Sequence, residues 1–110
     1  MKNNSTRLVG MLGFAMRAGK VTIGTDAVFL AMRNKKIRLV LVAADASEAT
    51  VRRVGYKCEF YELPLMQVGI DGAELGRMLG KTYAPAVIGI TDEGFAKEIQ
   101  KAVPTDGDQQ

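Results

Sequence analysis

Residues 21–47 predict a β-strand, an α-helix and a second β-strand in direct succession. Residues 21–23 are β-branched, and Gly24 then permits a sharp turn. Residues 27–33 contain neither glycine nor proline and consist largely of good helix formers. Residues 37–43 are almost entirely apolar, too few to cross a membrane, and rich in branched side chains. This pattern is typical of a central strand that helices cover on both faces.

The rest of the chain continues the alternation of helices and strands. Helices are predicted over residues 7–18, 48–61 and 71–79, with a last helix ending near residue 103. Short apolar runs predict strands over residues 65–68 and 86–90. The order α-β-α-β-α-β-α-β-α predicts a three-layer α/β/α sandwich around a four-stranded mixed sheet. Residues 1–103 are expected to form a single domain, and the polar residues 104–110 a disordered tail.

Short polar residues precede each predicted helix and are suited to cap its first turn. In chain order the candidates are Ser5 or Thr6, Thr25 or Asp26, Ser47 or Asp45, Asp71, and Thr91 or Asp92. N-capping is the commoner use of such side chains. We therefore do not interpret Asp26, Asp45 and Asp92 as a catalytic carboxylate cluster.

The polar residues of the 21–47 unit lie where its two strands end. They are Gly24, Thr25 and Asp26 after the first strand, and Asp45 and Ser47 after the second. We expect these ends side by side at the carboxyl edge of the sheet, where helix N-termini present free N–H groups to ligands. Arg17 and Lys20 lead directly into the first strand. They are expected beside the same site, or else to complement the dipole of the preceding helix.

Positive charge is concentrated in the first half of the chain. Residues 1–57 contain eleven basic and three acidic residues, and residues 58–110 contain four basic and nine acidic residues, which together give the net charge of +3. This distribution favours a polyanionic partner, nucleic acid before membrane, because no basic amphipathic helix with exposed aromatic residues is evident. The alternative is a solvated surface whose asymmetry has no function.

The sequence lacks a histidine base and the residue spacings that indicate common enzyme mechanisms. It has no histidine and one cysteine, Cys58, which fits the apolar face of the helix over residues 48–61. One thiol without histidine forms neither an internal disulfide nor the usual zinc set. Gly80-Lys81-Thr82 lacks the earlier glycine of a Walker A loop and follows a helix rather than a strand. We expect no enzyme, no cofactor and no metal and, without a secretory signal or membrane span, a cytoplasmic protein.

Several stretches together resemble one known family. They are residues 12–20, 24–26, 39–47, 57–61, 75–81 and 91–96. From about Arg7 to Val103 the chain resembles the L7Ae and L30e family of ribosomal proteins, in its bacterial YlxQ-like branch. The resemblance implies an α/β/α sandwich that binds RNA, in many members the kink-turn, a bent duplex with sheared G·A pairs. It also implies that residues 24–30 approach those pairs, and that the loops at 45–47 and 81–86 lie near a flipped-out nucleotide.

The resemblance is incomplete where kink-turn binders read the RNA. Those members carry Gly-Thr-Asn-Glu-x-x-Lys, whereas this sequence reads Gly-Thr-Asp-Ala-Val-Phe-Leu over residues 24–30. Asp26 cannot donate as asparagine does, Ala27 replaces the glutamate acceptor, and Leu30 replaces the lysine. These changes predict weaker selection of the kink-turn. Attraction to phosphates would persist through Arg17, Lys20, Lys81 and backbone N–H groups.

Two functions remain open from the sequence. The first is non-catalytic binding of structured, kink-turn-like or ribosomal RNA, with the ribosome as a candidate host and Tyr83 able to stack on an unpaired base. Its candidate contacts are Arg17, Lys20, Gly24, Thr25, Asp26, Leu30, Lys35, Lys36, Asp45, Ser47, Lys81, Thr82 and Tyr83. The second is a protein-interaction module that has lost specific RNA recognition. It would use Phe29 and Leu30, at least one of which is expected to point outward, to bind a protein partner or a second copy.

Overall fold

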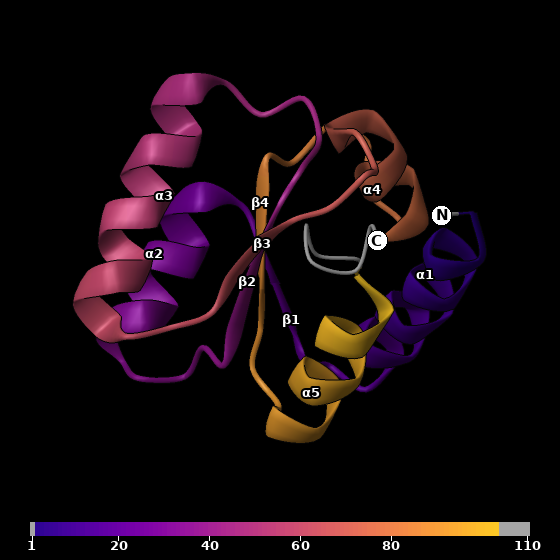
Figure 1. The fold of residues 1–110 in the computed structure, drawn as a ribbon, viewed down its shortest axis with the longest axis horizontal. Helices are drawn as coiled ribbons and strands as arrows, with labels where there is room; N and C mark the ends of the chain where they lie inside the picture. Colours follow the sequence, from indigo (N-terminus) through magenta and orange to yellow (C-terminus); the bar gives the residue numbers. More distant parts are fainter. Residues whose placement is uncertain (1, 104–110) are drawn as a thin grey trace, which may run out of the picture.

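Helices and strands alternate along the computed structural model, which describes residues 2–103 and the side chains of residues 6–103 (Figure 1). The elements are α1 (Lys2–Arg17), β1 (Val21–Ile23), α2 (Thr25–Arg33), β2 (Leu39–Val42), α3 (Glu48–Tyr61), β3 (Leu65–Gln67), α4 (Gly72–Met78), β4 (Val87–Ile90) and α5 (Glu93–Ala102). This is the predicted order. The predicted tail, residues 104–110, lies outside the described part. Within residues 2–103, no helix combines the length and apolar character needed to cross a membrane.

The four strands form one mixed sheet in the order β1-β4-β2-β3. β2 and β3 are parallel, and β4 runs antiparallel to both of its neighbours. Ile90, at the end of β4, therefore pairs with Val21 on one side and with Leu39 on the other, at the first residues of β1 and β2. The expectation that the ends of β1 and β2 are immediate neighbours is wrong, because β4 lies between them.

Helices cover both faces of the sheet, which gives the predicted three-layer sandwich. Figure 1 shows α2 and α3 on one side of the strands and α1, α4 and α5 on the other. Alternation along β2 explains the two cores: Leu39 and Leu41 pack toward α1, α4 and α5, whereas Val40 and Val42 pack toward α2 and α3. All residues of β2 are buried, as predicted for a strand that is covered on both faces, and all residues of β4 are buried as well.

Three helices begin with side-chain caps that the sequence predicts. The Ser47 hydroxyl accepts from Thr50 N–H at 3.1 Å, Asp71 accepts from Glu74 N–H at 2.8 Å, and Asp92 accepts from Phe95 N–H at 2.9 Å. The predicted start of α1 is wrong. This helix begins at Lys2, so Ser5 and Thr6 lie inside it, because no helix-breaking residue interrupts residues 2–6.

Candidate functional site

Three loops meet at one edge of the sheet, which we call the carboxyl edge and define as residues 24–26, 43–47 and 81–86. Gly24 N–H donates to the Val87 carbonyl and Ala43 N–H donates to the Ala86 carbonyl, both at 2.9 Å. The start of β4 thus holds together the loops that follow β1 and β2. In Figure 1 these turns lie at the same end of the strands as the connection from α4 to β4.

Gly24 sets the conformation of the first loop. Its φ of 103° lies in the region that favours glycine, and it is the N-cap residue of α2. Thr25 and Asp26 are the first residues of the helix, so the prediction that one of them caps it is wrong. Because Gly24 has no side chain, no side-chain cap covers the N–H groups of the first turn. Such groups can donate to an anion, and Asp26 places a negative charge beside them.

Asp45 and Ser47 both have structural partners at the carboxyl edge. The Asp45 carboxylate accepts from Gly72 N–H at 2.9 Å and so ties the second loop to the start of α4. Ser47 caps α3. The Gln67 side chain, at the end of β3, adds a further link by donating to the Ala43 carbonyl at 3.1 Å. These bonds hold the second loop against α3, α4 and β3.

The third loop lies close against α4 because two helix positions lack side chains. A Cβ on Gly72 would come within 2.8 Å of the Pro85 carbonyl oxygen, and one on Gly76 would overlap the Tyr83 carbonyl oxygen. A shallow hollow of about 370 Å³ lies between loop and helix. Its lining includes the exposed Lys81 and Tyr83, the latter 54% exposed.

Arg77 also lines this hollow, although it is not among the residues predicted from the sequence. Its guanidinium pairs with the Glu74 carboxylate one turn earlier on α4. Arg77 lies four residues before Lys81, a spacing that could have suggested their proximity. The hollow therefore combines two cations with one exposed aromatic ring. Thr82 lines the hollow too, which therefore brings together three of the predicted contacts, Lys81, Thr82 and Tyr83.

The predicted contacts Arg17, Lys20, Lys35 and Lys36 do not lie at the carboxyl edge. The Lys20 carbonyl accepts from Thr91 N–H at 3.0 Å, and Arg38 N–H donates to the Ile90 carbonyl at 2.7 Å. These four cations therefore belong to the opposite edge, about 10 Å away across a three-residue strand. The expectation that Arg17 and Lys20 flank the Gly24 turn is wrong, because they precede a strand whose far end forms that turn.

The outer face of α2 carries apolar side chains, although the helix begins at the proposed site on the carboxyl edge. Leu30 is 55% exposed, so one of the predicted pair does point outward. Phe29 is only partly exposed and lies beneath two α3 cations, with Arg53 5.4 Å and Lys57 5.3 Å from its ring centroid. Ala27, one turn earlier on the helix, is also exposed.

Cys58 lies in the core between the sheet and α3. It is 3% exposed, and burial raises the pKa of its thiol to about 11. The thiol is therefore protonated at neutral pH and poorly nucleophilic. Among the described residues, no three histidine, cysteine, aspartate or glutamate side chains gather where they could hold a metal ion.

The chain is similar to proteins of one family over almost its whole length. The sequence model of the ribosomal protein L7Ae/L30e/S12e/Gadd45 family matches residues 6–100. The RNA-binding protein YlxQ of Enterococcus faecium is 37% identical over 93% of this chain and 96% of that protein. The large ribosomal subunit protein eL30 of Sulfolobus acidocaldarius is 30% identical over 83% and 88%, respectively. The solved structure of a Bacillus halodurans protein of unknown function covers 87% of this chain and 95% of its own, with a TM-score of 0.80 and 32% identity.

Proposed function

This chain belongs to the ribosomal protein L7Ae/L30e/S12e/Gadd45 family, and from this premise we propose that it is a non-catalytic RNA-binding protein whose carboxyl edge contacts structured RNA. The relatives named RNA-binding protein YlxQ and ribosomal protein eL30 support RNA as the partner. A kink-turn-like or ribosomal RNA is the ligand we favour. The protein would then act in the cytoplasm, within a ribonucleoprotein such as the ribosome.

One observation carries the assignment of the site: the uncapped start of α2, the loop at 43–47 and the loop at 81–86 converge around the first residue of β4. Backbone N–H groups at a helix start can bind phosphate oxygens, which fix the register of an RNA. Tyr83 offers a ring for an unpaired base beside Lys81 and Arg77. Phosphate contacts therefore would come from Lys81 and Arg77, and base contacts from Tyr83.

The test compares two lysines at opposite edges of the sheet. Lys81→Ala removes a cation from the carboxyl edge, and Lys20→Ala removes the same charge from the other edge. Each variant is titrated by gel shift against a kink-turn RNA, across a salt series. We expect Lys81→Ala to weaken binding several-fold and to lower the slope of log affinity against log salt by about one. Lys20→Ala should bind as the unaltered protein does.

Equal losses of RNA affinity in Lys81→Ala and Lys20→Ala would contradict the assignment of the site to the carboxyl edge. Absence of RNA binding by the unaltered protein would contradict the proposed function.

The same titrations include a second RNA, in which Watson–Crick pairs replace the G·A pairs of the kink-turn. Preference for the kink-turn would mean that residues 24–30 still read the motif. Equal affinity for both RNAs would mean that contacts to phosphates dominate.

A protein-interaction module is the second candidate function, and one observation favours it: Leu30 is 55% exposed. Phe29 contributes less than expected because Arg53 and Lys57 cover its ring. Self-association that is insensitive to salt and lost on Leu30→Lys would support this function. RNA binding with a steep dependence on salt would support the first.

A further inference from the structure

Four of the seven aromatic residues of the chain gather on the outer surface of α2 and α3, away from the carboxyl edge. We call this the α3 surface and define it by Phe29, Arg53, Tyr56, Lys57, Phe60 and Tyr61, which line a shallow hollow of about 410 Å³. Tyr56 is 66% exposed and Phe60 is 77% exposed. Neither ring is needed for the core, so burial on folding does not explain their presence.

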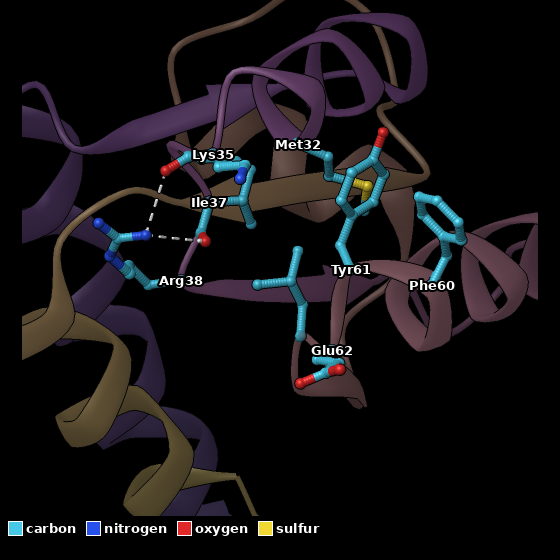
Figure 2. A pocket seen from close by; sticks show the side chains of 8 residues that line it. Met32, Lys35, Ile37, Arg38, Phe60, Tyr61 and Glu62 are labelled. Carbon is cyan, nitrogen blue, oxygen red and sulfur yellow. Dashed lines mark hydrogen bonds between the residues drawn. The ribbon is translucent and has the colours of Figure 1, made fainter.

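Two rings of the α3 surface pack against each other, and a third leaves the same helix on the same side. The Phe60 ring meets the Tyr61 ring edge to face, with 4.9 Å between centroids. Figure 2 shows these rings side by side at the end of α3, with Tyr61 next to Met32 of α2. Tyr56 precedes Phe60 by four residues, so their side chains leave the helix on the same side, about 6 Å apart along its axis.

The α3 surface is positively charged and carries no carboxylate among its defining residues. Arg53 and Lys57 lie over Phe29, and within the described part of the chain neither of them takes part in an ion pair. A guanidinium that lies over a ring keeps its N–H groups available to a phosphate. Both cations can therefore contact an anionic ligand without first breaking a salt bridge.

A second hollow continues the α3 surface toward the edge of the sheet opposite the carboxyl edge. It shares Phe60 and Tyr61 with the first hollow and adds Lys35 and Arg38 (Figure 2). Arg38 is oriented by hydrogen bonds to the carbonyls of Lys35 and Ile37, at 3.2 and 3.5 Å. The linings of the two hollows thus contain four cations and four rings, with Glu62 as their one carboxylate. Arg38 also lies 4.0 Å from the Glu93 carboxylate.

We propose that the α3 surface binds a single-stranded RNA segment, with unpaired bases stacked on Tyr56 and Phe60 and phosphates contacted by Arg53 and Lys57. Interleaved rings and cations suit such a strand, because every base has a face that can stack and every linkage carries a negative charge. A protein partner would match the rings but would need acidic residues opposite both cations. This inference rests on the proposed function for the choice of RNA but assigns a different surface.

The test titrates the full chain into labelled ten-nucleotide oligouridine and, separately, into the labelled kink-turn RNA, and measures the fluorescence anisotropy of each RNA. The variants are Tyr56→Ala, Phe60→Ala and the charge variant Arg53→Ala. Phe14→Ala is the matched control, because Phe14 is also an exposed ring beside an arginine, with Arg17 at 4.9 Å, but lies on α1 on the other face of the sheet. All four sites are exposed, so these variants should fold.

Tyr56→Ala and Phe60→Ala should each weaken oligouridine binding roughly fivefold or more, as expected for the loss of one stacked base. Arg53→Ala should lower the slope of log oligouridine affinity against log salt by about one. Phe14→Ala should change neither affinity, and the kink-turn RNA should bind all four variants equally well.

Oligouridine affinity that survives both ring substitutions would overturn the inference. So would loss of oligouridine binding in Lys81→Ala alone, which would assign both RNAs to the carboxyl edge and leave the proposed function intact. Concentration-dependent dimerisation that Phe60→Ala abolishes, with oligouridine affinity unchanged, would assign the surface to a protein contact and also overturn it. If the unaltered protein bound neither oligouridine nor the kink-turn RNA, both proposals would be overturned.

Discussion

The Asp45 carboxylate accepts a hydrogen bond from the backbone N–H of Gly72 at 2.9 Å, which joins the loop after β2 to the first residue of α4. Asp71, the residue directly before α4, caps the same helix by accepting a hydrogen bond from Glu74 N–H. Two carboxylates thus hold the start of a seven-residue helix that is too short to be stable alone. Since α4 carries Arg77 and supports the loop at 81–86, Asp45 fixes two parts of the carboxyl edge relative to each other.

Replacement of Asp45 by alanine should lower the free energy of unfolding by about 1 to 2 kcal/mol, because Gly72 N–H loses a charged acceptor. Asp45→Asn keeps an acceptor oxygen and should lose less than half of that. Urea unfolding followed by circular dichroism measures both. If Asp45 acted only by contacting RNA, the two variants would be as stable as the unaltered protein.

Gly76→Ala should displace the loop at 81–86, because the added methyl group would overlap the Tyr83 carbonyl oxygen. We expect a loss of stability of roughly 2 kcal/mol or more from this overpacking. Gly10→Ala is the matched control, since Gly10 also lies in a helix but the added Cβ would have no neighbour within 4 Å apart from the local backbone of that helix. That change should stabilise α1 by up to about 1 kcal/mol. Thermal unfolding of the two variants should therefore shift in opposite directions.

The fold could be predicted from the sequence because its elements have local signals. Apolar runs mark β2 and β4, and short polar residues mark the starts of α3, α4 and α5. Strand order has no such signal. That β4 lies between β1 and β2 depends on long-range pairing, which the sequence pattern of either strand does not encode.

The site was predictable only in part, for the same reason. Residues that follow strands, such as Gly24 and Asp45, were assigned to the correct edge because chain direction fixes where a strand ends. Lys20 lies at the opposite edge although it is near Gly24 in sequence, because β1 separates the two residues. The α3 surface escaped detection because Tyr56 and Phe60 lie on a helix face whose exposure depends on how α3 packs.

Restoring three polar residues on α2 should create selection for the kink-turn if the carboxyl edge is the RNA site. The triple variant Asp26→Asn, Ala27→Glu, Leu30→Lys reproduces the sequence of kink-turn binders at positions that are exposed here, so the core should not change. We expect the ratio of affinities for the kink-turn and its Watson–Crick counterpart to rise tenfold or more, by analogy with base-directed contacts worth about 1 to 3 kcal/mol each. An unchanged ratio in gel-shift titrations would show that these residues do not reach the bases.

The buried thiol of Cys58 should make the protein less stable in alkaline solution. Burial raises its pKa from 9.0 to about 11, so folding favours the neutral thiol and ionisation favours the unfolded chain. The stabilisation is complete below pH 9 and is lost as the pH rises toward 11, by up to roughly 2 kcal/mol. Because lysines titrate in the same range, the measurement is the difference in unfolding free energy between the unaltered protein and Cys58→Ala, at pH 8 and at pH 10.5. This difference should shrink at the higher pH, and a constant difference would mean that the thiol ionises equally well in the folded and unfolded chains.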